Sequence, residues 1–181
     1  MSSNITSMNA PRTQPSYPGD YDGNIVGLWL RIDPIRWIAG VLAGAFGGAI
    51  ALAVAMGISQ SAGKELWFPA KLMSTPILGS VGTDNRIGTG LIVGLLVWEA
   101  ICVFWGFVYS HFVATNSPRA LLSMGLVWAC FLWIFNWNLY FQSFLPIRWA
   151  SVPSSVVFLL CLIYGLSLSS VAGFERIFRR S

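Results

Sequence analysis

The sequence predicts an all-α integral membrane protein: a four-transmembrane-helix bundle with two interfacial aromatic/proline loop segments and a polar N-terminal tail. Three observations support this fold class. Of the 181 residues, 55% are hydrophobic and only 10% are charged, whereas a typical soluble domain is about 25% charged. Four apolar runs are each long enough to cross a bilayer, which takes about 20 residues. Glycine is concentrated inside these runs, as in GVLAGAFGG at positions 40–48.

The N-terminal region is polar. Residues 1–24 contain three prolines and few apolar side chains, a composition typical of chain that is disordered or becomes ordered only on a partner. A removable signal peptide would instead place a short apolar core near the start. Residues 25–34 mix large apolar side chains with Arg31 and Asp33, which predicts a short interfacial segment. Pro34 suits the first turn of the helix that follows.

The transmembrane domain is expected to occupy residues 35–174, followed by a basic C-terminal tail at residues 175–181. Glu99 is the only charged residue that lies away from the ends of a predicted span. The spans are predicted at about 35–58, 87–113, 120–138 and 152–171.

Two connecting segments are unusually apolar. LWFPAKLMSTPIL (66–78) and NLYFQSFLPIRWAS (138–151) are aromatic but too short and proline-broken to cross a bilayer, so both are predicted to dip into the headgroup region. Their recurrence after a long helix indicates either an internal repeat, as in transporters, or the general preference of Trp and Tyr for interfaces. Lys64 and Glu65, which precede the first segment, are expected to be solvated.

Basic residues predict the orientation, because Lys and Arg accumulate on the cytoplasmic side. If both termini are cytoplasmic, that side holds seven basic residues: Arg12, Arg31, Arg36, Arg119, Arg176, Arg179 and Arg180. The other side holds four: Lys64, Lys71, Arg86 and Arg148. This bias favours cytoplasmic termini, in a bacterial inner membrane. The net charge of +4 is therefore assigned to topology and lipid contact rather than to nucleic-acid binding.

The glycines of the first span form a packing face. Gly40, Gly44 and Gly48 recur every four residues, and in lipid such a stripe lets two helix backbones approach closely. Gly90 and Gly94 repeat the spacing in the second span. The first two spans are therefore expected to pack tightly on each other or on a partner chain.

Glu99 is the most informative residue for chemistry, because a charge at the bilayer centre costs about 2.5–3.5 kcal/mol. It is either a carboxyl that carries a proton or binds a cation, or a protonated side chain bonded to a backbone carbonyl or a partner subunit. Asn136 and Asn138 could reach it only if the helices are offset.

The third span is rich in aromatic residues. Trp128 and Phe131 lie deeper than an interfacial aromatic belt requires, and Trp133 follows them in the same span. They either pack helices together or contact a lipid, quinone or pigment at a subunit interface. His111, the only histidine, is expected to form hydrogen bonds near the headgroups, since a bis-histidine haem would need a second one. The cysteines show no metal or redox spacing and are interpreted as small buried hydrophobes: Cys102, Cys130 and Cys161.

Three function classes follow. The first is a non-catalytic subunit of a larger membrane complex, most simply a respiratory or photosynthetic electron-transfer assembly. Its partners would be lipids and other integral membrane subunits, and it would carry no cofactor of its own. The second is a small homo-oligomeric proton- or ion-coupled transporter or channel that uses Glu99, although its spans offer little polar lining. A membrane-embedded enzyme is disfavoured, because no G-x-S-x-G, P-loop or H-E-x-x-H motif is present.

Overall fold

The structure, a computed structural model, describes residues 32–79, 88–113, 115–140 and 152–180. Every regular element in these ranges is helical, and four helices are long and apolar enough to cross a membrane. Both findings confirm the predicted all-α class and the number of apolar spans. The polar tail, residues 25–31 of the interfacial segment and most of the second connecting segment lie outside the described residues.

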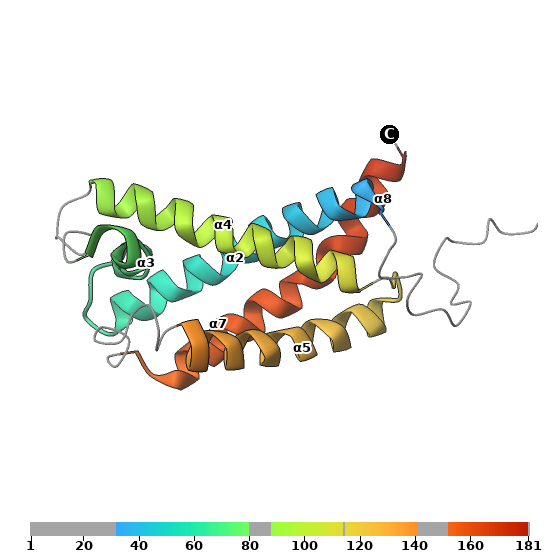
Figure 1. Ribbon diagram of the computed structural model, residues 1–181. Coiled ribbons are helices and arrows are strands. Elements are labelled where there is room, and N and C mark those ends of the chain that lie inside the picture. Colours follow the sequence, from blue (N-terminus) through green and yellow to red (C-terminus); the bar gives the residue numbers. More distant parts are fainter. Residues whose placement is uncertain (1–31, 80–87, 114, 141–151, 181) are drawn as a thin grey trace, which may run out of the picture.

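Two helix pairs make up the bundle (Figure 1). In the first pair, α2 (Pro34–Ser61) packs along α4 (Thr89–Phe112); in the second, α5 (Pro118–Phe135) packs along α7 (Ser154–Ser167). Contacts between α2 and α7 join the pairs. The closest backbone contacts therefore run from α4 through α2 and α7 to α5, and α4 and α5 also face each other through aromatic side chains.

The start of α2 is set by two adjacent residues. Asp33 is the N-cap, and its Oδ1 accepts a hydrogen bond from the Arg36 backbone N–H at 3.3 Å. Pro34 takes the first helical position, where its missing N–H would have no intrahelical partner.

The first connecting segment contains a helix where sequence analysis predicts an interfacial loop. This helix, α3 (Phe68–Leu78), packs on α4 and α2. Pro76 removes the N–H that would bond the Leu72 carbonyl, and the Thr75 hydroxyl donates to that carbonyl instead at 2.7 Å. The helix ends at Gly79, whose φ of 60° favours glycine. The proline is therefore tolerated, and the segment is helical.

The last two apolar runs extend into further helical turns. A π-helical turn, η2 (Asn136–Tyr140), follows α5. A 3-10 turn, η4 (Leu168–Ser170), joins α7 to α8 (Val171–Arg180). Residues 175–180 are thus helical, which corrects the predicted basic tail, and α8 packs against the first turns of α2.

Candidate functional site

The seam between α2 and α4 is built on backbone contact. A Cβ atom at Gly44 would lie 2.5 Å from the Cys102 carbonyl oxygen and 3.0 Å from the Gly106 Cα. One at Gly40 would lie 2.7 Å from the Gly106 carbonyl oxygen, and one at Gly48 would lie 2.7 Å from the Cys102 Cβ. All three glycines of the stripe therefore face α4 at distances that leave no room for a side chain.

The glycines of α4 divide between two neighbours. Gly106, which sequence analysis did not single out, lies opposite the stripe on α2. Gly94 faces α3 instead, where an added Cβ would lie 2.6 Å from the Ala70 carbonyl carbon. Gly90 is half-buried in the first turn of α4. The spacing of Gly90 and Gly94 therefore does not mark the surface that meets α2.

Glu99 lies at the outer edge of the α2–α4 seam. Its Oε2 is 3.1 Å from the position of a Cβ on Gly48, whose carbonyl accepts a hydrogen bond from Trp98 Nε1 at 2.9 Å. Leu96 and Ile92, which precede Glu99 on the same helix face, are 66% and 61% exposed. Glu99 is half-buried, and no described residue donates a hydrogen bond to its carboxyl.

The two asparagines considered as partners of Glu99 are bonded elsewhere. Asn136 Nδ2 lies 3.7 Å from Cys161 Sγ, and Asn138 Nδ2 donates to the Ile134 carbonyl at 3.1 Å. Asn136 thus contacts α7, and Asn138 bonds a carbonyl in the last turn of α5.

Aromatic side chains of α4 and α5 pack on one another. The Trp105 ring centroid lies 6.0 Å from that of Trp128 and 5.8 Å from that of Phe131, both edge-to-face. Trp133 points the other way and packs on Phe158 of α7 at 5.5 Å. The three aromatics singled out from the sequence therefore belong to two different contacts. The buried indole N–H groups of Trp128 and Trp133 find no acceptor within the described ranges.

His111 also packs through its ring. Its centroid lies 6.0 Å from Trp37 on α2 and 5.4 Å from Phe112. Of the cysteines, Cys102 and Cys161 are buried and Cys130 is exposed, so the expected burial holds for two of the three.

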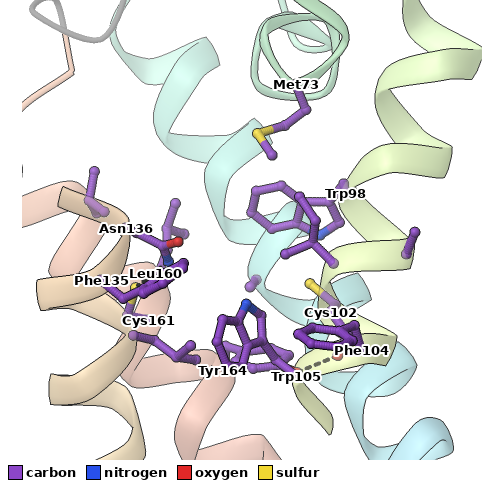
Figure 2. A pocket seen from close by; sticks show the side chains of 15 residues that line it. Met73, Trp98, Cys102, Phe104, Trp105, Phe135, Asn136, Leu160, Cys161 and Tyr164 are labelled. Atoms are coloured by element: carbon purple, nitrogen blue, oxygen red, sulfur yellow. Dashed lines mark hydrogen bonds between the residues drawn. The ribbon is translucent and has the colours of Figure 1, made fainter. Parts of the chain in front are cut away.

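A cavity of about 430 Å³ lies between the two helix pairs. Figure 2 shows Trp98, Cys102 and Trp105 of α4 facing Asn136 and Cys161 across it. The Tyr164 hydroxyl donates to the Cys102 carbonyl at 2.5 Å and joins α7 to α4 beside the cavity. The lining is almost entirely apolar, with one amide, which suits a hydrophobic molecule of moderate size. Glu99 does not line it.

A buried ionic network ties the other end of the bundle together, and sequence analysis missed it. The Arg36 side chain is 10% exposed, and its Nη1 bonds Glu175 Oε2 at 2.7 Å and Asn116 Oδ1 at 2.9 Å. Its Nε donates to the Val113 carbonyl at 3.1 Å, and its Nη2 to the Thr115 carbonyl at 2.9 Å. One guanidinium thus links the start of α2 with the end of α4, the chain leading to α5, and α8.

Arg179 completes this network. Its Nε donates to Glu175 Oε1 at 2.7 Å, and its Nη2 to Asp33 Oδ2 at 2.6 Å. The spacing of Glu175 and Arg179, four residues apart on a helix, is visible in the sequence. The pairing of Arg36 with Glu175, 139 residues away, leaves no such signal.

A second ion pair, in which only the lysine is fully buried, lies at the opposite end. The Lys71 side chain on α3 is 1% exposed, and its Nζ lies 2.6 and 2.8 Å from the two Glu65 carboxylate oxygens. This corrects the expectation that Glu65 is simply solvated. Lys64 is exposed and lies 4.7 Å from the centroid of the Phe68 ring.

The two halves of this pair are expected to respond differently to substitution. Glu65→Gln leaves the buried Lys71 ammonium without a counter-charge, and we expect it to lower the free energy of unfolding by about 3 kcal/mol. Lys71→Met leaves only a partly exposed carboxylate, so a smaller loss is expected. Unfolding of the purified protein in mixed detergent–SDS micelles measures both. An equal loss in the two variants would show that burial of Lys71 is not what matters.

In the described ranges, no group of three or more His, Cys, Asp or Glu side chains is placed to hold a metal ion. Comparisons of the chain with protein-family models, with curated proteins and with solved structures find no match.

Proposed function

We propose that this chain is a non-catalytic integral membrane subunit of a larger complex, where it packs against and stabilises other integral membrane subunits. The observation that carries the proposal is the position of Glu99. Its carboxyl lies near the middle of the 24-residue α4, at the outer edge of a helix seam and beside the exposed Leu96. In hydrocarbon an unpaired charge there would cost about 2.5–3.5 kcal/mol. A second chain that covers this face and donates a hydrogen bond would offset that cost.

Within this class we favour a respiratory or photosynthetic electron-transfer complex. The support comes from the aromatic cluster between α4 and α5, where Phe131 is 42% exposed. Flat, apolar side chains at such a surface suit contact with a lipid, quinone or pigment held at a subunit interface. The chain would contribute contact surface and hold no cofactor of its own.

We also propose a bacterial inner membrane location with both termini cytoplasmic. The first described helix begins and the last ends at the same end of the bundle, where Arg36 bonds Glu175 (Figure 1). Arg119 in the first turn of α5 and the arginines of α8 lie at this end too. The positive-inside rule assigns such an end to the cytoplasm.

A photo-crosslinking side chain placed at Leu96 tests the partner proposal. Position 96 is next to Glu99 on the exposed face, and the same label at Val127, 63% exposed on α5, samples a different face. In native membranes we expect the label at 96 to capture a different membrane protein, identified by mass spectrometry. Capture of a second copy of this chain would favour a homo-oligomer. Capture of lipid alone at position 96 would contradict both.

Glu99→Gln gives a second test. Glutamine keeps the shape but not the charge-assisted hydrogen bond of a carboxylate, so we expect several-fold less intact complex after extraction in mild detergent. Cys130→Ser, a polar change on an exposed face of α5, is the control and should leave the yield unchanged. A Glu99→Gln variant with normal assembly would argue against the carboxyl as a partner contact.

The alternative is a homo-oligomeric proton- or ion-coupled transporter or channel. It is favoured by the same carboxyl, which is half-buried and bonded to no described residue, and so is free to take up a proton or cation. In proteoliposomes this alternative predicts proton or cation flux by the wild-type oligomer and loss of that flux in Glu99→Gln. Absence of flux in the wild type would leave the subunit proposal standing.

A further inference from the structure

A second pocket lies at the end of the bundle where α2 begins and α8 ends. Its volume is about 410 Å³, and the residues that line it are all polar or charged: Asn116, Glu175, Arg176, Arg179 and Arg180. Arg179 and Arg180 follow Arg176 by three and four residues, so both lie on the same side of α8 as Arg176. This pocket is separate from the apolar cavity and from Glu99.

The charges around the pocket do not cancel. Glu175 is 5% exposed at its side chain and is already bound by Arg36 and Arg179. Arg179 also pairs with Asp33. These two acids and two arginines balance one another. Arg176 and Arg180 are exposed and form no ion pair with any described residue, so no acid in the described ranges compensates these two positive charges.

The surroundings of the pocket are amphipathic. All four apolar helices begin or end at the end of the bundle that holds this pocket. The terminal residues there are Pro34, Phe112, Pro118 and Arg180. Ile177, between the arginines on α8, is 64% exposed, and Phe112 is 48% exposed. A ligand that fits here carries an anionic head for the arginines and an apolar body that lies along these side chains.

We propose that this pocket binds the phosphodiester headgroup of an anionic phospholipid, with Arg176 and Arg180 as its principal contacts. Guanidinium groups bind phosphate oxygens through paired, charge-assisted hydrogen bonds. Basic pockets between membrane helices on the cytoplasmic side are suited to acidic lipid headgroups. A zwitterionic headgroup carries its own cation, which would lie against the uncompensated arginines and weaken binding. The Glu175 pairs hold the floor of the pocket in place.

The test is lipid binding to the purified full-length chain in detergent, followed by native mass spectrometry. The probes are dioleoyl phosphatidylglycerol, dioleoyl phosphatidylcholine and inorganic phosphate. The variant is Arg176→Gln with Arg180→Gln, and Arg119→Gln is the matched control, because Arg119 is an exposed arginine in the first turn of α5 at the same end.

We expect phosphatidylglycerol to bind the wild type at least tenfold more tightly than phosphatidylcholine. The double variant should lose at least tenfold in phosphatidylglycerol affinity, and Arg119→Gln should change it less than twofold. Arg176→Lys with Arg180→Lys keeps the charge but not the guanidinium fork, so an intermediate loss is expected. This variant also keeps the test valid if the glutamine variant unfolds.

Three results would overturn the proposal. Equal affinity for the two lipids would show that the net charge of the headgroup does not determine binding. An equal loss in Arg119→Gln would show a diffuse surface effect. Displacement of phosphatidylglycerol by millimolar inorganic phosphate would show a site for the free anion. None of these depends on the partner contact at Glu99, which the crosslink at position 96 tests separately.

Discussion

Gly44→Ala is expected to lower the free energy of unfolding by about 1–3 kcal/mol, although it adds a single methyl group. That methyl would lie 2.5 Å from the Cys102 carbonyl oxygen and 3.0 Å from the Gly106 Cα. Both are backbone atoms, so no side-chain rotation can relieve the overlap, and α2 and α4 must separate. The small-residue packing that holds the seam together then weakens along its length.

Gly57→Ala in the same helix is the matched control. An added Cβ there meets no atom within 4 Å, so only the helix propensity changes, in favour of alanine by up to about 1 kcal/mol. Unfolding in mixed detergent–SDS micelles should therefore show opposite signs for the two substitutions. The same sign and size at both positions would mean that α2 and α4 are not in backbone contact.

Gly44→Leu extends the series. Its larger side chain cannot fit between the helices, so we expect a greater loss than for alanine. The apolar cavity does not provide this space, because Gly44 is not part of its lining.

Much of the fold follows from local sequence. Long apolar runs give the four candidate spans, and a glycine every fourth residue identifies the face of α2 that packs most closely. Prolines also act locally: Pro34 and Pro118 both lie in the first turn of their helices. The third span begins at Pro118 rather than at the predicted residue 120, because Pro118, like Pro34, suits the first turn of a helix.

Two features that sequence analysis missed have different causes: one is a local contact and the other is a contact between distant residues. The prolines of α3 do not break the helix, because Pro69 lies in the first turn and the Thr75 hydroxyl bonds the carbonyl that Pro76 leaves without a donor. The last span is predicted to end at about residue 171, but the helix continues through α8 to Arg180. Glu175 is buried there only because Arg36, far away in sequence, reaches it. No periodicity in the sequence encodes that pairing.

For the candidate sites too, the sequence identifies some residues but does not predict how they are placed. A carboxyl inside an apolar run, Glu99, stands out in any sequence. Its position at the edge of a seam, away from the cavity, depends on how α4 is rotated about its axis. The same rotation decides that Gly106 faces α2 while Gly94 faces α3. Helical periodicity alone cannot specify it when nearly every face of the helix is apolar.

Arg36→Met is expected to lower the free energy of unfolding by about 3 kcal/mol, because it leaves a buried carboxylate with half its counter-charge. Glu175 would keep Arg179 but lose the 2.7 Å contact with Arg36. The carbonyls of Val113 and Thr115 would lose a charged donor as well. Since these groups belong to the end of α4 and the chain that follows it, the loss should loosen the junction of α2, α4 and α8 together.

Three comparisons separate this network from a general charge effect. Arg119→Met removes an exposed arginine at the same end and should change stability by less than about 0.5 kcal/mol. Arg36→Lys keeps the charge, but one ammonium cannot reach acceptors on three segments, so it should recover less than half of the loss. Adding Glu175→Met to Arg36→Met removes the orphaned carboxylate and should restore part of the stability. The opposite result is that the double variant loses about a further 3 kcal/mol relative to Arg36→Met, the cost of breaking another buried ion pair. That result would show that Arg179, rather than Arg36, is the main partner of Glu175. The anchor of α8 on α2 would then be the pair of Arg179 with Asp33.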